Sequence, residues 1–218
     1  MVYYLGLPAR KFNDDRLART LDALAPHARD IWLAVVSQAI QRYGIDLHRP
    51  FYDLVAYVAH GEYADSQIVT FGYAHNTPGD KRKAKVGLTV SAEGNIPVDY
   101  LPWPGATADK ATVPTNLDQV ARWLRTHGYA PDQVLVIGDR ATLDDRLALT
   151  YEAHHLRYLA GLQPQRTEHQ ALLAGVSEAA FYRHPLTAAQ GPQGYWGVPV
   201  AVPFEHDGQR VVHQGLVV

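Results

Sequence analysis

The sequence has 218 residues, 47% of them hydrophobic and 19% charged, a composition that is ordinary for a globular protein and excludes general disorder. It contains no cysteine, which excludes a disulfide framework and a thiolate zinc site and makes a reducing, cytoplasmic compartment the expectation. A net charge of −2 does not indicate nucleic-acid binding, and there is no apolar run of 18 residues that would predict a membrane span.

Two helices are predicted between residues 13 and 44. Asn13 is suited to cap the first, in which leucines recur at helical spacing: Leu17, Leu21 and Leu24. Pro26 interrupts the pattern, and a second apolar series then ends near Gly44. The segment reads as a small helical unit that precedes the main fold.

The pattern changes to strands from residue 50. Three runs rich in β-branched and aromatic residues predict strands: FYDLVAYV (51–58), IVTFGYA (68–74) and KVGLTVSA (85–92). The links between them are too short for the crossover that a parallel return requires. We therefore expect three antiparallel neighbours.

After residue 105 helices and strands alternate. Apolar residues at helical spacing predict helices around 117–124 and 143–151, and the runs 134–138 and 157–162 predict buried strands. Three antiparallel strands followed by this β-α-β-α alternation predict an α/β fold, a mixed sheet with helices against its faces. Beyond it, 166–181 predicts one more helix, and the tail predicts two strands around an Asp-Gly turn.

Two aspartates are candidate functional residues. Asp53 lies inside an apolar strand, where a carboxylate is costly unless it is paired, hydrogen-bonded or bound to a cation. Asp139 follows the strand 134–138, and open α/β sheets bind ligands beyond the carboxyl ends of their strands. Each also has a structural interpretation: Asp53 can face solvent from a half-exposed strand, and Asp139 can cap the next helix.

The two acids together indicate more than either does alone. If the first and fourth predicted strands lie side by side, Asp53 and Asp139 converge on one point. Hard oxygen ligands without cysteine favour Mg²⁺ over zinc, and such carboxylates are the usual basis of two-metal phosphodiester chemistry. Asp53 and Asp139 are therefore candidate metal ligands.

A run of cations, KRKAK (81–85), is predicted to lie on the turn before a strand. It either contacts DNA phosphates or forms a solvated turn that keeps a strand edge soluble. Arg140 either acts at the site beside Asp139 or pairs with Asp144 across one helical turn. The candidate DNA-contacting residues are Lys81, Arg82, Lys83 and Arg140.

Several stretches resemble the DDE transposases of bacterial insertion sequences, in the IS4-like group and closest to its IS1634 branch. FYDLVAYVAHGEY resembles the block with the first catalytic Asp, which corresponds to Asp53. Residues 71–112 are similar to the second block, with its Val-Gly-Leu strand and Pro-Gly-x-Thr-x-Asp segment. Residues 134–162 resemble the block with the second catalytic Asp, commonly followed by Arg, which corresponds to Asp139.

The resemblance implies an RNase H-like fold, with 1–48 as an N-terminal helical segment, 49–164 as an incomplete catalytic core and 165–218 as the start of a β-rich insertion. The implied activity is Mg²⁺- or Mn²⁺-dependent cleavage and strand transfer at transposon ends, with Asp53 and Asp139 as catalytic metal ligands. The implied partners are transposon ends and target DNA, with a homodimer as one expected state. The implied location is the bacterial cytoplasm, at the nucleoid.

Such transposases also carry a third acid, a Glu on a late helix that follows a Tyr-Arg pair and precedes a Lys. That pattern is not found, so no third residue is assigned. The glutamates that fall elsewhere include Glu152, Glu168, Glu178 and Glu205. We therefore expect a truncated transposase, whose two-metal site is complete only if the third acid is supplied. The alternatives are an inactive DNA-binding or oligomerisation remnant and, more distantly, another metal-dependent phosphohydrolase.

Overall fold

The structure is a computed structural model that describes residues 6, 8, 12–74, 78–163, 166–177, 180, 182–184 and 195–217. The chain divides into two units, residues 1–46 and residues 47–218. Each unit is described by itself. No described helix is both long and apolar enough to cross a membrane.

The first unit is helical, as predicted. Its elements are α2 (Asp14–Leu24), the 3₁₀ turn η2 (Ala25–His27) and α3 (Ala28–Tyr43). The Asn13 side chain accepts a hydrogen bond from the Arg16 backbone N–H and so caps α2. Gly44 ends α3 with φ of 62°, a left-handed conformation in which glycine is favoured.

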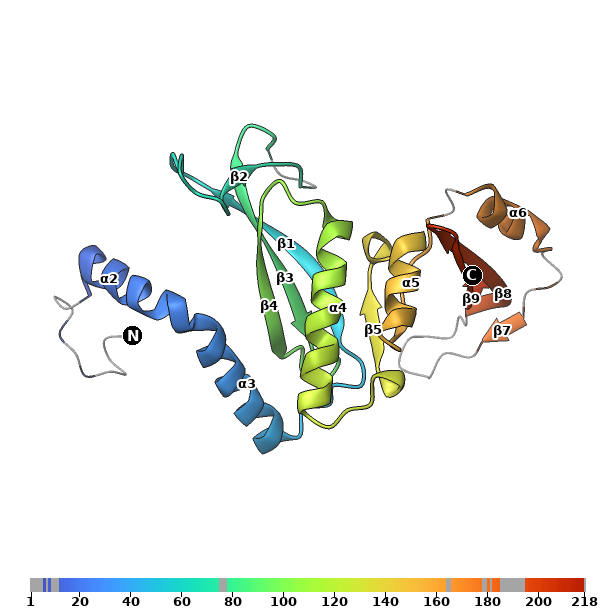
Figure 1. The fold of residues 1–218 in the computed structure, drawn as a ribbon, viewed down its shortest axis with the longest axis horizontal. Helices are drawn as coiled ribbons and strands as arrows, with labels where there is room; N and C mark the ends of the chain where they lie inside the picture. Colours follow the sequence, from blue (N-terminus) through green and yellow to red (C-terminus); the bar gives the residue numbers. More distant parts are fainter. Residues whose placement is uncertain are drawn as a thin grey trace. The chain divides into compact units, whose positions relative to one another are not determined.

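The second unit is built on a six-stranded mixed sheet (Figure 1). Its strands are β1 (Phe51–Ala59), β2 (Thr70–Phe71), β3 (Arg82–Val90), β4 (Pro97–Pro104), β5 (Leu135–Gly138) and β6 (Arg157–Leu159). β3 is antiparallel to β1, β2 and β4, whereas β5 is parallel to both β1 and β6. The order β4-β3-β1-β5-β6, with β3 running against the other four, is that of an RNase H-like sheet.

The prediction that the run 68–74 forms one of the three long antiparallel strands was wrong. Of the run 68–74 only Thr70–Phe71 forms a strand, and the long third strand is Pro97–Pro104 instead. This strand contains three prolines, at 97, 102 and 104, which cannot donate to a ladder and made the run unlike a strand in sequence. β4 accommodates them because it pairs on one side only, with β3. Its edge position therefore explains both the prolines and the missed prediction.

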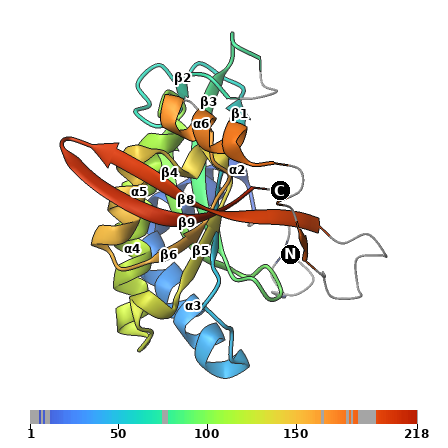
Figure 2. The same cartoon turned by 90° about the vertical axis from the view of Figure 1, so that its right-hand side faces the viewer.

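Two helices cover one face of the sheet, α4 (Asp109–Thr126) and α5 (Asp145–Ala153) (Figure 2). Beneath α4 the core is unusually polar. The Asn116 amide donates to Thr89 Oγ1 at 2.9 Å, and the Tyr52 hydroxyl donates to Thr112 Oγ1 at 2.8 Å. On the opposite face of the sheet, the β1 side chains Phe51, Val55 and Tyr57 are exposed.

The C-terminal part of the unit is a second, three-stranded sheet with one short helix. Its elements are α6 (Thr167–Gly175), β7 (Tyr182–His184), β8 (Tyr195–His206) and β9 (Gln209–Val217). The predicted Asp-Gly turn joins β8 to β9, with positive φ at both Asp207 and Gly208. The resulting ribbon packs on α5 through a core cluster formed by Leu143, Ala148, Val202 and Phe204 (Figure 2).

Candidate metal and nucleic-acid site

The two candidate carboxylates are carried by neighbouring parallel strands. β1 pairs with β5 in a register that matches Phe51 with Ile137 and Tyr52 with Gly138. The next residue in each segment is an aspartate, because Asp53 follows Tyr52 in β1 and Asp139 follows Gly138 at the end of β5. Because adjacent strands lie about 4.8 Å apart, residues distant in sequence become direct neighbours at the carboxyl end of β5. The predicted adjacency of these two strands is confirmed.

Both carboxylates are exposed, and each has one local hydrogen bond. Asp53 Oδ1 accepts from the Leu54 backbone N–H at 2.7 Å, and Asp139 Oδ1 accepts from the Ala141 N–H at 2.8 Å. Asp139 thereby caps the 3₁₀ turn η4 (Arg140–Thr142), so its structural interpretation also holds. Within the described residues neither carboxylate has an ion pair, and the second oxygen of each remains available to a cation.

The sheet beneath the acids holds a buried tyrosine. Tyr52 precedes Asp53 and faces the opposite side of the sheet, under α4, where it is only 4% exposed. Burial raises the pKa of Tyr52 to about 12, and the nearby carboxylates of Asp109 and Asp53 act in the same direction. The phenol is therefore protonated at neutral pH and serves as a hydrogen-bond donor in the core.

A third metal ligand is not found among the described residues, which contain no group of three or more acidic or histidine side chains placed to hold a metal ion. The glutamates considered from the sequence have cationic or imidazole partners instead. Glu152 lies 3.3 Å from His213, and both Glu168 and Glu205 pair with Arg166 and Arg210. Glu178 lies outside the described residues.

The basic run was predicted to lie on a turn, and this holds only for Lys81, because residues 82–85 form the start of β3. Lys81 and Arg82 retain solvent exposure, but Lys83 is 0% exposed. Its ammonium donates to the backbone carbonyls of Gly72, Pro78 and Lys81 at 3.0, 2.7 and 3.0 Å. Direct contact of Lys83 with DNA is therefore contradicted, because every proton of its ammonium is used inside the fold.

The next cation of the run is also structural. Lys85 lies on the same buried face of β3, and its ammonium binds Asp109 Oδ1 at 2.9 Å and the Thr107 carbonyl at 2.7 Å. The alternation of a strand places every second residue on one face, so Lys83 and Lys85 are buried together. This burial has no signal in the sequence, because four clustered cations resemble a solvated segment.

Arg140 is exposed and follows Asp139 directly. The alternative pairing with Asp144 is not what the structure shows. Asp144 caps α5 by accepting from the Leu147 backbone N–H at 2.9 Å, and it lies 3.5 Å from the Lys110 ammonium. Arg140 thus remains beside the carboxylate pair.

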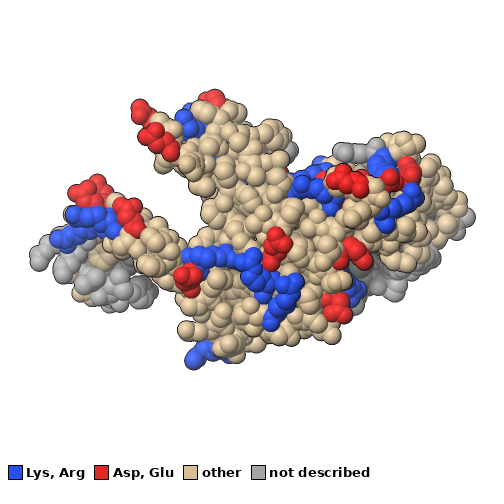
Figure 3. Space-filling view, viewed as in Figure 1, with Lys and Arg blue, Asp and Glu red and all other residues tan. Residues whose placement is uncertain are grey.

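Basic side chains are not gathered into one extended patch on the face that Figure 3 shows. Lys and Arg lie in separate groups, with Asp and Glu among them. This distribution agrees with the net charge of −2. Contacts with a nucleic acid on this face would therefore be local.

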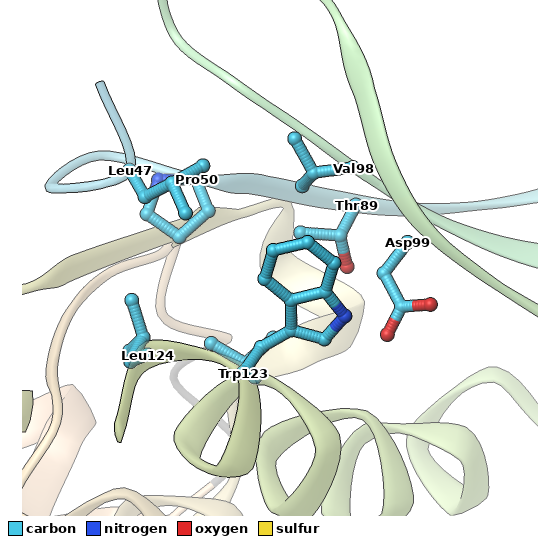
Figure 4. A pocket seen from close by; sticks show the side chains of 8 residues that line it. Leu47, Pro50, Thr89, Val98, Asp99, Trp123 and Leu124 are labelled. Carbon is cyan, nitrogen blue, oxygen red and sulfur yellow. The ribbon is translucent and has the colours of Figure 1, made fainter. Parts of the chain in front are cut away.

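A small cavity between the sheet and α4 is too small for a ligand. Trp123 reaches from α4 towards the sheet, where Thr89 and Asp99 line the same space (Figure 4). The cavity measures about 20 Å³, which is room for about one water molecule. It therefore belongs to the core and is not a binding site.

The comparisons with known proteins find similarity in structure only. No protein-family model matches the sequence, and no curated protein matches it. Among solved structures, the Mos1 transposase paired-end complex with the left transposon end is similar to 60% of this chain and 40% of its own, at 15% identity and a TM-score of 0.36. A piggyBac transposase synaptic complex with hairpin DNA matches 60% of this chain and 26% of its own, at 14% identity and a TM-score of 0.39.

A third similar structure contains the Mos1 transposase catalytic domain, raltegravir and manganese. It matches 60% of this chain and 57% of its own, at 15% identity and a TM-score of 0.35. This chain thus spans from about a quarter to just over half of the transposase chains that it matches.

Proposed function

We propose that the chain is the RNase H-like core of a DDE-type transposase of the IS4-like group, acting in metal-dependent cleavage and strand transfer at transposon ends. The observation that carries the proposal is the β1–β5 register, which pairs Tyr52 with Gly138, the residues that directly precede Asp53 and Asp139. Asp53 lies within β1 and Asp139 directly follows β5. Both carboxylates are exposed and neither has a competing ion pair among the described residues, so together they can hold a divalent cation. The ordered sequence blocks around both acids give independent support.

The donor set fits Mg²⁺ or Mn²⁺ in part. Carboxylate oxygens are the ligands these ions prefer, and Mg²⁺ is usually held by one or two carboxylates together with water and substrate phosphates. A bound ion would polarise a phosphodiester and activate the attacking oxygen. Asp53 and Asp139 would hold the cation and so fix where the scissile phosphate binds. A third carboxylate would be needed to complete a two-metal site.

The DNA contacts that we propose are Lys81, Arg82 and Arg140. Each has an exposed or half-exposed guanidinium or ammonium group. Contacts of this kind position the phosphate backbone without reading bases. Lys83 is not among them because its ammonium is buried.

A nicking assay on supercoiled plasmid tests the proposal. We expect that nicking in Mg²⁺ or Mn²⁺, by the chain alone or with the third carboxylate supplied in trans, is lost in Asp53→Asn and in Asp139→Asn. Asp132→Asn is the matched control, since Asp132 is an exposed aspartate near the opposite end of β5. Nicking that survives both site substitutions would overturn the assignment of the carboxylates.

The second candidate is a DNA-binding or oligomerisation remnant without catalysis. It is favoured because, among the described residues, no group of three or more acidic or histidine side chains is placed to hold a metal ion. DNA binding that is unchanged by Asp139→Asn, together with no nicking in either metal, would support the remnant. Loss of both binding and cleavage would contradict both functions.

A further inference from the structure

A second cavity lies at the far end of β1 from the carboxylates. It has a volume of about 200 Å³ and is lined by Ala59, His60, Gly61, Phe71, Asp80, Lys81 and Arg82. Asp53 precedes Ala59 by six positions in β1, which corresponds to about 20 Å along a strand. The cavity is therefore a separate feature from the candidate metal site.

The lining combines an exposed aromatic ring with cations. Phe71 is 55% exposed, although it lies in β2 and is hydrogen-bonded into the sheet through its backbone. The Arg82 guanidinium lies 4.7 Å from the centre of the Phe71 ring, at the distance of a cation–π contact. Lys81 and His60 add basic groups, and Asp80 is offset by Lys81 at 3.6 Å. The site is thus aromatic and positive on balance.

The buried Lys83 ammonium fixes the two backbone segments that carry this lining. It binds the carbonyl of Gly72, which follows Phe71, and the carbonyl of Lys81, which precedes Arg82. The Phe71 ring and the Arg82 guanidinium are therefore positioned by the Lys83 ammonium, which is itself fully buried.

Close backbone packing makes the same wall rigid. A Cβ at Gly72 would lie 2.1 Å from the Gly105 carbonyl oxygen, and a Cβ at Gly105 would lie 2.2 Å from the Lys83 carbonyl oxygen. Only glycine fits at both positions. The Gly105 N–H donates to the Ile68 carbonyl at 3.1 Å, and the Ala106 N–H donates to Thr70 Oγ1 at 3.0 Å. The cavity is thus backed by an ordered wall.

We propose that this cavity binds one unpaired nucleotide of a single-stranded nucleic acid, with the base stacked on Phe71 and the phosphate bound by Arg82 and Lys81. Stacking platforms flanked by cations are how proteins hold single strands without reading sequence. A volume below the roughly 300–1,000 Å³ of pockets for drug-sized ligands suits one nucleotide unit. Bases in a duplex are stacked inside and cannot reach such a platform. The proposal rests on the proposed function only in that the ligand is nucleic acid, and it does not require the metal site.

Fluorescence anisotropy with labelled oligothymidylate and with a duplex of equal length, both in EDTA, tests the proposal. We expect Phe71→Leu to weaken single-strand binding by about tenfold, because a base–aromatic stack is lost, and to leave duplex binding unchanged. Arg82→Gln should weaken single-strand binding as well. Thymidine monophosphate should displace the oligonucleotide at concentrations where inorganic phosphate does not.

Tyr43→Leu is the matched control. Tyr43 is 73% exposed and the Arg42 guanidinium lies 6.0 Å from its ring centre, so an aromatic ring and a cation also lie together at this exposed position. Its removal should change neither affinity. Because these measurements are made in EDTA, they do not depend on a bound metal ion, which separates failure of the metal site from failure of this site.

Photocrosslinking with 5-iodouracil in the oligonucleotide gives a second readout that does not depend on a substitution. The crosslink is expected at Phe71. Three results would each overturn the proposal. Phe71→Leu could bind the single strand as tightly as the unmodified chain does, or it could lose equal affinity for the single strand and the duplex. Inorganic phosphate could also displace the oligonucleotide as effectively as the nucleotide does.

Discussion

Replacing the buried Lys83 with methionine tests the structural role assigned to its ammonium. Methionine keeps the aliphatic stem and removes the donor, so three backbone carbonyls lose their partner: those of Gly72, Pro78 and Lys81. An unsatisfied buried acceptor costs about 1 kcal/mol at the lower end of the usual range, which gives about 3 kcal/mol for three. The relief of burying a charge offsets part of this cost. We expect a net loss of about 2 kcal/mol in the free energy of unfolding.

Urea unfolding followed by tryptophan fluorescence measures this loss as a lower midpoint with an unchanged slope. The control is Lys81→Met. Lys81 is about half exposed, and among the described residues it has one carboxylate within ion-pair range, that of Asp80 at 3.6 Å. An exposed pair of this kind contributes at most about 1 kcal/mol. Equal midpoints for Lys83→Met and Lys81→Met would refute the account of Lys83.

Three further predictions concern the sheet and its core. Gly105→Ala should lower the free energy of unfolding by about 2 kcal/mol or more, because the added Cβ would meet the Lys83 carbonyl oxygen. The control is Gly79→Ala, whose Cβ would meet nothing within 4 Å and which should be near neutral in the same urea experiment. Burial raises the pKa of Tyr52 and of Tyr151 to about 12. Above pH 10 these tyrosines ionise more readily in the unfolded chain than in the folded one, so the free energy of unfolding should fall between pH 10 and 12. A constant urea midpoint over that range would contradict this prediction. The chain has no cysteine, so two introduced cysteines can pair only with each other. The double variant Asp53→Cys, Asp139→Cys should form a disulfide under mild oxidation, whereas Tyr57→Cys, Asp139→Cys should not. The reverse result on non-reducing gels would contradict the β1–β5 register.

Much of the sheet could be predicted because its signals are local. The apolar run 134–138 and the apolar series at 117–124 have the periods of a buried strand and of a helix, although α4 begins earlier, at Asp109, without a side-chain cap. β4 could not be predicted in this way. Its prolines exclude it from the middle of a sheet, and only the tertiary arrangement shows that it lies on an edge.

The candidate site shows the same division. Asp53 and Asp139 were identified because an acid in or after an apolar strand is unusual and because the surrounding blocks resemble those of transposases. The burial of Lys83 could not be identified, since its three carbonyl partners are brought together only by folding of the loop around it. Nor could the pairing of Lys85 with Asp109, which are 24 residues apart. The pattern of charged residues along the sequence does not specify which cationic side chains are buried.

The central claim is that Asp53 and Asp139 jointly bind one divalent cation. Electron paramagnetic resonance of Mn²⁺ titrated into the full chain measures this directly, because bound and free ion give distinct signals. We expect binding that either Asp53→Asn or Asp139→Asn weakens by at least tenfold, since even groups outside the ligand shell alter metal affinity by about 10–100-fold. Asp132→Asn should have no effect. Mn²⁺ binding that is unchanged when either aspartate of the pair is replaced would contradict the claim.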